Sequence, residues 1–309
     1  MTVTQAEWDN IKATARKSTR IDGEDLPYLD LGPPTGPNLI FTNGALLTMD
    51  FWKYQAPVFA QFFRTIVYDY RESGPRANNP EGFTADLADI IEQLDLAPVT
   101  IIASSMGGLF TARYAADHPE LLNGMVICSS FPRFPQRLLV NLGLVGSYFV
   151  PTRVLASRSR VLVCGDRDKE LGDLFMRTVS AMASRTVRNR YMILRNTRIH
   201  DVLPRIKGVP TLIMSGTLDE DVPSEHGKYL ADHIDGAEYK LLEGGGHLGY
   251  FEQHDQFNTI VLDWLKSKGL FRSPGSGGSG AVSGLNQGKF AAPPWRADLR
   301  GVSSKPRAL

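Results

Sequence analysis

Residues 99–110 read VTIIASSMGGLF, and this stretch decides the fold. The run from Val99 to Ala103 is apolar and rich in β-branched residues, which is typical of a central parallel strand covered on both faces. Helical spacing begins at Gly107 and must end near the His118-Pro119 pair. The sequence therefore predicts a buried strand, an abrupt turn and a helix that begins at once.

Two serines, Ser104 and Ser105, lie at the predicted bend. A serine on such a bend is a nucleophile elbow, in which strained backbone holds the hydroxyl above the sheet and only small residues fit two positions away. Ser105 has Ala103 and Gly107 at those positions, whereas Ser104 is flanked by large side chains. The alternative is an ordinary turn that contains serines by chance. The strand before it and the helix after it favour Ser105 as a nucleophile.

The composition is that of a globular protein. The chain has 309 residues, 42% of them hydrophobic, and a formal net charge of +1. It is long enough for one large α/β domain or two small ones, and its charge gives no reason to expect nucleic acid or an anionic membrane as a partner. Cys128 and Cys164 each lie in an apolar run that reads as a strand, which favours buried free thiols and a reducing compartment.

The beginning of the chain indicates a cytoplasmic protein. Residues 1–8 are polar and lack the basic-then-apolar order of a signal peptide. The longest apolar run, residues 138–150, is too short for a membrane span and is interrupted by Asn141 and two glycines.

A change of composition at residues 273–280, which read SPGSGGSG, predicts an engineered Gly/Ser linker. It separates a mildly acidic domain, residues 1–272, from a tail at 281–309 with five basic residues and one acidic residue. The tail is either a vector remnant, a disordered natural extension or a fused partner peptide anchored by Phe290 and Trp295. We favour the peptide, because flexible spacers normally hold two binding units together.

Strand and helix patterns alternate through the first half of the domain. Residues 16–31 predict a hairpin that turns near Asp22-Gly23. Further strands are predicted at 38–42, 65–70, 99–103 and 124–128, and helices over 51–63 and 83–96. This alternation predicts an α/β fold with a mostly parallel central sheet and helices on both faces.

The alternation stops between Ser129 and about Pro204, where several helical patterns carry many arginines. We interpret this region, about residues 131–204, as an inserted helical cap. The sheet pattern then resumes with strands at 209–216 and 239–242, and with helices near 224–233 and 253–268.

The last two strands end in residues that a nucleophilic serine needs. A serine hydroxyl requires a base to take its proton, and the base requires a carboxylate to orient it. In this architecture the chain order is serine, acid, histidine, each on a loop at the carboxyl end of a strand. Asp219 is the preferred acid, with Asp221 second and Glu220 third, and His247, which follows three glycines, is the predicted base.

A similar pattern, Gly165-Asp166-Arg167-Asp168, follows the apolar run that ends at Cys164. It lies in the predicted cap and far upstream of His247, so we interpret it as a decoy.

Two backbone N–H groups are candidates for an oxyanion hole. One belongs to Met106, directly after the serine, and the other to Ala45, in the turn after the strand at 38–42. The alternative for residues 42–45 is a plain Asn-Gly turn. The sequence contains no His/Cys cluster with metal-ligand spacing and no Gly-rich phosphate loop, so we expect neither a metal nor a cofactor.

Residues 16–268 resemble the α/β-hydrolase fold family. The resemblance rests on four segments: Ala103-Ser104-Ser105-Met106-Gly107-Gly108, the loop Asp69-Tyr70-Arg71 through Gly74, residues 216–223 (GTLDEDVP), and Gly246-His247 followed by Tyr250-Phe251-Glu252. It implies a Ser105–His247–Asp219 triad and a cap that covers the pocket. Two positions depart from the family pattern, because Asn43-Gly44 replaces the usual His-Gly and Ala103 replaces the first glycine of the elbow.

The cap and residues 126–131 are more weakly similar to maspardin-type members of the family, some of which act through partners.

The sequence thus predicts a serine hydrolase that cleaves a small or medium acyl ester, or a related carbonyl compound, through an acyl-enzyme. The apolar segment around Leu138, Leu142, Leu144, Tyr148 and Phe149 either lines an acyl pocket or packs the cap against the core. The alternative function is a hydrolase-fold binding or signalling protein that recognises a partner peptide such as the tail.

Overall fold

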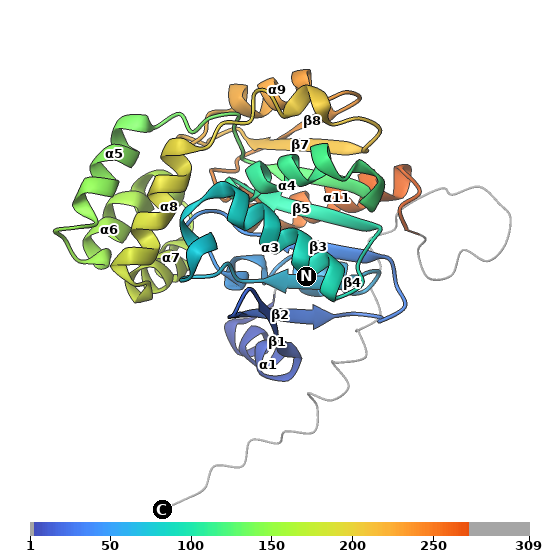
Figure 1. The fold of residues 1–309 in the computed structure, drawn as a ribbon, viewed down its shortest axis with the longest axis horizontal. Coiled ribbons are helices and arrows are strands. Elements are labelled where there is room, and N and C mark those ends of the chain that lie inside the picture. The colour runs from blue at the N-terminus through green and yellow to red at the C-terminus, as the bar shows by residue number, and fades with distance from the viewer. Residues whose placement is uncertain (1–2, 272–309) are drawn as a thin grey trace, which may run out of the picture. The chain divides into compact units, whose positions relative to one another are not determined.

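The computed structural model describes residues 3–271, so the predicted linker (273–280) and tail (281–309) lie outside the described residues. Figure 1 shows a twisted sheet with helices packed on it. The sheet has eight strands in the order β1-β2-β4-β3-β5-β6-β7-β8. The hairpin of β1 (Arg16–Ile21) and β2 (Glu24–Leu31) is antiparallel, as is the pair β2–β4, and the other five strand pairs are parallel.

The centre of the sheet is β5 (Val99–Ser104), which lies between β3 (Asn38–Thr42) and β6 (Leu122–Cys128) and has all six of its residues buried. Its register is set by apolar pairs, with Ile101 opposite Ile40 on one side and Met125 on the other. The remaining strands are β4 (Arg64–Tyr68), β7 (Thr211–Gly216) and β8 (Glu238–Leu242). The predicted α/β fold with a mostly parallel sheet is confirmed.

Helices cover the sheet on both sides. Figure 1 shows α3 and α4 in front of the strands and α11 behind them. Phe83 of α3 stacks on Phe110 of α4 with ring centroids 5.1 Å apart, which joins these two helices. The helices outside the 129–204 region are α1 (Gln5–Ala15), α2 (Ala56–Phe59), α3 (Pro80–Gln93), α4 (Met106–Asp117), α9 (Ser224–His233), α10 (Gly249–Glu252) and α11 (His254–Ser267).

The helix predicted over residues 51–63 is wrong in its extent. The structure has a 3-10 turn at Met49–Trp52 and then the single turn of α2. Pro57 has no N–H and its ring clashes with the preceding turn, so it is tolerated only where a helix begins. The chain therefore starts a new turn there instead of continuing one helix.

The strand predicted before Cys164 is also wrong. The apolar run at 161–163 is the last turn of α6 (Thr152–Val163), and Cys164 caps that helix. A short apolar run has no periodicity that separates a strand from a buried helix end. Both cysteines are free and buried, as predicted, and burial raises the pKa of each thiol to about 12.

Four helices lie between β6 and β7, within the residues predicted as the cap: α5 (Arg137–Gly146), α6, α7 (Lys169–Ala181) and α8 (Ser184–Asn196). We call α5–α8 the helical insertion. Figure 1 shows it grouped at one end of the sheet. None of the helices described here is both long and apolar enough to cross a lipid bilayer.

Buried cations fasten the helical insertion to the sheet. Arg190 of α8 donates to the carbonyl of Arg71 at 2.8 Å and lies 4.5 Å from the centroid of the Phe83 ring. Burial lowers the pKa of its guanidinium to about 10. Lys53, next to the 3-10 turn, pairs with Glu170 of α7, and the Tyr54 hydroxyl donates to the same carboxylate at 2.7 Å. These contacts hold one end of the insertion against the loops of the sheet.

Candidate active site

Ser105 occupies the bend between β5 and α4. Its backbone has φ 51° and ψ −117°, a conformation that residues with a side chain rarely adopt. The bend is tight: a Cβ at Gly107 would lie 2.7 Å from the Asn43 carbonyl oxygen, and one at Gly108 would lie 2.5 Å from Ser130 Oγ. Ser105 lines a cavity, whereas Ser104 is fully buried in β5.

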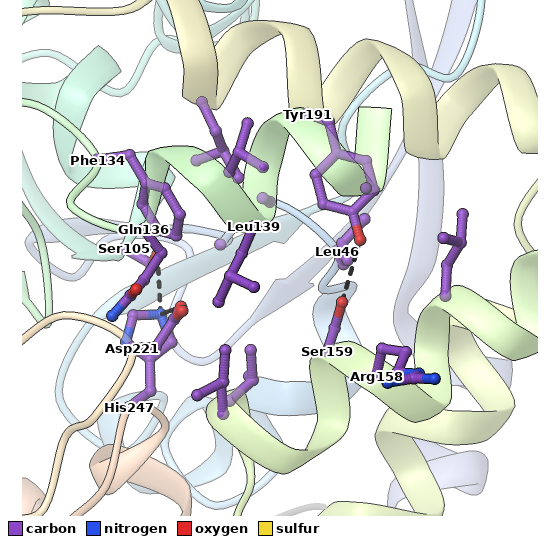
Figure 2. A pocket seen from close by; sticks show the side chains of 18 of the residues that line it. Leu46, Ser105, Phe134, Gln136, Leu139, Arg158, Ser159, Tyr191, Asp221 and His247 are labelled. Carbon is purple, nitrogen blue, oxygen red and sulfur yellow. Dashed lines mark hydrogen bonds and ion pairs between the residues drawn. The ribbon is translucent and has the colours of Figure 1, made fainter. Parts of the chain in front are cut away.

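The structure brings Ser105, His247 and Asp219 together. Ser105 Oγ lies 3.0 Å from His247 Nε2, and His247 Nδ1 lies 3.0 Å from Asp219 Oδ2 and 3.2 Å from Oδ1. Figure 2 shows the imidazole of His247 against the serine hydroxyl. The three side chains follow β5, β7 and β8, whose carboxyl ends meet at one edge of the sheet. The distances from Ser105 to His247 and from His247 to Asp219 are all within hydrogen-bonding range, which suits proton transfer from the serine.

The loop after β7 turns around the carboxylate of Asp219. Its Oδ1 accepts the backbone N–H groups of Asp221 at 3.1 Å and Val222 at 2.8 Å, and the side chain is fully buried. These bonds fix the carboxylate beneath the imidazole and make the chain turn back, so that the side chain of Asp221 faces the cavity. Glu220, the third alternative for the acid, is exposed.

The loop after β8 is held by Glu252 of α10. This carboxylate accepts the N–H of Gly246 and pairs with Arg167 at 3.1 Å. Arg167 belongs to the segment that the sequence identified as a decoy, and it thus supports the histidine loop from the helical insertion. In the same segment Asp168 caps α7 by accepting the N–H of Leu171.

Carboxylates surround the imidazole of His247. Burial disfavours the imidazolium and by itself would lower the pKa of His247. The carboxylate of Asp219, helped by those of Asp221 and Glu252, outweighs burial and raises this pKa to about 9. Burial raises the pKa of Asp221, and Asp219 adds to this rise while His247 opposes it.

The position of Asp221 is the feature that sequence reasoning missed. The sequence offered it as an alternative partner for Nδ1, but its Oδ2 lies 3.7 Å from Nε2, on the side of the imidazole that meets Ser105. Its side chain is 10% exposed and lines the cavity. The only signal in the sequence is a second acidic residue two positions after the first.

The predicted oxyanion turn passes close to the serine. A Cβ at Gly44 would lie 3.4 Å from Ser105 Cβ, and Ala45 lines the same cavity. Asn43 is fully buried: its amide donates to the Tyr68 carbonyl at 2.8 Å and its Oδ1 accepts the Trp52 indole N–H at 2.8 Å. Asn43 therefore holds the turn in place from within the core.

A cavity of about 360 Å³ lies between the sheet edge and the helical insertion. Most of its lining is apolar and comes from α5, α6 and α8. The segment predicted either to line a pocket or to pack the cap does both in part: Leu142 lines the cavity and Leu144 is buried outside it, whereas Leu138, Tyr148 and Phe149 are exposed. A short helix presents only one stripe to a cavity, and Leu138 lies outside that stripe, 71% exposed. The apolar lining includes Leu46, Leu47, Phe134, Leu139, Val140, Leu142, Leu155, Leu162, Val163, Phe175 and Leu194.

Polar groups lie at two places in the cavity. Gln136, Asp221, His247 and Ser105 are at one, and the hydrogen-bonded pair of Ser159 and Tyr191 (3.0 Å) is across from them, with Arg158 beside Ser159 (Figure 2). Within residues 3–271, no group of three or more His, Cys, Asp or Glu side chains is arranged to hold a metal ion.

Comparisons with known proteins point to the same architecture. The chain is 27% identical over 247 residues to the protein named "Putative carbamate hydrolase RutD" of Stutzerimonas stutzeri, covering 75% of this chain and 92% of that protein. It is 28% identical over 263 residues to "Putative non-heme bromoperoxidase BpoC" of Mycobacterium tuberculosis, covering 79% and 98%. Its fold matches the enol-lactonase of Burkholderia xenovorans with a TM-score of 0.76 at 23% identity, covering 81% and 100%.

The family evidence covers most of the chain. The sequence profile described as "Alpha/beta hydrolase family" matches residues 39–260, which include the strand-turn-helix at Ser105, the helical insertion and the loops of Asp219 and His247. The chain belongs to the alpha/beta hydrolase family.

Proposed function

We propose that the protein is a serine hydrolase that cleaves a small or medium acyl ester, or a related carbonyl compound, through an acyl-enzyme on Ser105. The observation that carries this proposal is the series of short distances from Ser105 Oγ to His247 and on to Asp219. The positive φ of Ser105 supports it, since such strain is found where a nucleophile is held ready.

In the first half of the reaction, Ser105 Oγ attacks the substrate carbonyl carbon and His247 Nε2 takes the hydroxyl proton. Asp219 holds Nδ1–H and stabilises the imidazolium. The tetrahedral intermediate then collapses, the bond to the leaving group breaks, and the imidazolium gives its proton to the departing oxygen. An acyl group remains on Ser105 and the alcohol leaves.

The negative charge of the intermediate needs donors. We assign this role to the N–H groups of Met106, the first residue of α4, and Ala45, because neither donates to a protein acceptor among residues 3–271. Each such donor contributes on the order of 3 kcal/mol to the transition state.

In the second half, His247 takes a proton from a water molecule, which attacks the acyl carbon. The acid is released and the proton returns to Ser105. No other group is required for this sequence of steps.

The cavity supports an apolar acyl chain. At about 360 Å³ it has room for a short or medium chain, and its lining offers few hydrogen-bond partners. The carbamate hydrolase name of one relative makes carbamates a second compound class for testing.

A fluorophosphonate probe tests the proposal directly. We expect it to label Ser105, as mapped by mass spectrometry, and we expect p-nitrophenyl butyrate to be cleaved by the wild type but not by Ser105→Ala. A folded wild-type protein that is neither labelled nor active would contradict the proposal and favour the hydrolase-fold binding protein.

A further inference from the structure

Asp221 is a buried carboxylate that the reaction above does not use. Its side chain is nine-tenths buried, and within residues 3–271 no N–H or O–H group donates a hydrogen bond to it. It forms an ion pair with His247 Nε2 at 3.7 Å when the imidazole is protonated, a distance that exceeds hydrogen-bond length. A buried carboxylate without a donor is costly unless a positive charge compensates it.

The surroundings of Asp221 leave it open toward a ligand. It lines the cavity together with Ser105 and His247, and much of the wall that faces them is apolar, including Leu139 and Phe134 (Figure 2). In a mostly apolar cavity, a few placed polar groups decide which ligand binds and in which orientation. Asp221 is the one acidic side chain among the described residues that line this cavity.

The distance to Nε2 shows which part of a substrate Asp221 meets. During ester cleavage, Nε2 delivers its proton to the leaving oxygen, which must lie within hydrogen-bond reach of it. Since Asp221 Oδ2 lies 3.7 Å from the same nitrogen, a short chain on the leaving oxygen reaches the carboxylate.

We propose that Asp221 forms a cation-binding subsite, which selects esters whose leaving alcohol carries a protonated amine. This inference rests on the proposed function and names a substrate class for the same site. The ammonium group of the alcohol pairs with Asp221 while the acyl chain occupies the apolar part of the cavity.

The same carboxylate also attracts the proton on His247. The carboxylates around the imidazole are Asp219 and Asp221 on the loop after β7 and Glu252 on α10. Two cations belong to the insertion: Arg167 pairs with Glu252, and Arg158 of α6 lines the cavity. An ammonium group on Asp221 weakens the field that holds the imidazolium, so its binding releases a proton from Nε2. A cationic ligand should therefore bind more weakly as the pH falls.

Two esters of equal shape test the proposal. One is 2-(dimethylamino)ethyl butyrate, protonated at neutral pH, and the other is its uncharged isostere, 3-methylbutyl butyrate. We expect the wild type to prefer the cationic ester by about tenfold or more in kcat/KM at pH 7, and Asp221→Asn to bring that ratio close to one. Both esters use the same base, so the ratio cancels any effect of the substitution on His247.

Glu220→Gln is the matched control, because it removes the same charge from the neighbouring exposed position. It should leave the ratio unchanged. A ratio near one in the wild type, or an equal loss of the ratio in Glu220→Gln, would overturn the subsite.

Binding to Ser105→Ala separates this proposal from the proposed function. The ligands are the amide analogues of the two esters, N-[2-(dimethylamino)ethyl]butanamide and N-(3-methylbutyl)butanamide, measured by calorimetry. Preference for the cationic amide that is lost in Ser105→Ala/Asp221→Asn supports the subsite even if the wild type cleaves no ester. Equal or undetectable binding of both amides, together with ester cleavage that shows no preference, refutes the subsite and leaves the proposed function standing.

Discussion

The carboxyl edge of the sheet and the helical insertion enclose one cavity but contribute different side chains to it. The sheet loops supply Ser105, Asp221 and His247, whereas the polar groups from the insertion are Arg158, Ser159 and Tyr191. The insertion supplies mostly aliphatic and aromatic groups, and some of these, such as Leu139 and Leu142, are also about half exposed to solvent.

This difference shows where variation is tolerated. A side chain added at Gly107 or Gly216 would meet backbone oxygens, so these two positions at the sheet edge require glycine. The α5 side chains that line the cavity, Leu139 and Leu142, are partly exposed to solvent, so other side chains fit at their positions more easily. We infer that the sheet edge sets the reaction and the insertion sets which acyl group enters.

The largest expected effect is at the elbow. Ser105→Ala should lower kcat/KM for p-nitrophenyl butyrate by about 10⁴-fold or more, because the nucleophile is lost. Ser104→Ala, at the neighbouring buried position, is the control and should retain activity while keeping the same fold by circular dichroism. Equal loss in both variants would assign the effect to the strand rather than to the nucleophile.

The second effect concerns the contact between the sheet loops and the helical insertion. Arg71 is buried, pairs with Asp86 through two hydrogen bonds of 2.5 and 2.7 Å, and offers its carbonyl to Arg190 of the insertion. Arg71→Met should lower the free energy of unfolding by about 3–5 kcal/mol in urea denaturation, since it leaves a buried carboxylate without its main partner.

Arg76→Met is the control variant for Arg71→Met, because Arg76 pairs with the same Asp86 from a more exposed position. It should cost about 1 kcal/mol or less. The double variant Arg71→Met/Asp86→Leu should recover part of the loss, and its failure to do so would place the effect elsewhere than in the ion pair.

The third effect is the pH dependence of the reaction. Below its pKa the imidazole of His247 is protonated and cannot accept the serine proton, so kcat/KM should rise with pH, reach half its maximum near pH 9 and level off above that pH. At pH 7 we expect it to be about a hundredfold below the plateau, since the pKa of His247 is raised to about 9.

Asp221→Asn should move this midpoint to lower pH, because it removes one of the carboxylates that favour the imidazolium. Glu220→Gln should not move it. A midpoint near the ordinary histidine value in the wild type would mean that these carboxylates do not act on the base.

The smallest effect belongs to the insertion. Leu139→Lys should reduce kcat/KM for p-nitrophenyl butyrate by about tenfold by placing a charge at the apolar wall. Leu138→Lys, one residue away and outside the cavity, should change it little. If both substitutions behaved alike, α5 would not contact the acyl group.

The sheet and its loops were the predictable part of the molecule. The run at 99–103 is short, β-branched and apolar, and the small residues around Ser105 permit only a tight bend, so local sequence determines that region. The order of strands then places the loops of Asp219 and His247 beside it, which is where the structure has them.

The cavity was less predictable because it depends on tertiary packing. Sequence spacing cannot tell which of two carboxylates two residues apart faces Nδ1, since the answer depends on the turn around Asp219. The sequence of α5 likewise does not indicate which of its apolar side chains face the cavity. Ser159 and Tyr191 meet only because α6 and α8 pack together there.

The positive φ of Ser105 has a consequence for heat resistance. A backbone conformation of this kind costs the folded state about 1–3 kcal/mol. Glycine adopts it freely, so a chain adapted only to withstand high temperature would carry glycine at position 105 and would lose the proposed nucleophile. If Ser105 has the proposed role, its side chain is retained at a cost in stability, and added thermal tolerance has to come from substitutions elsewhere in the chain.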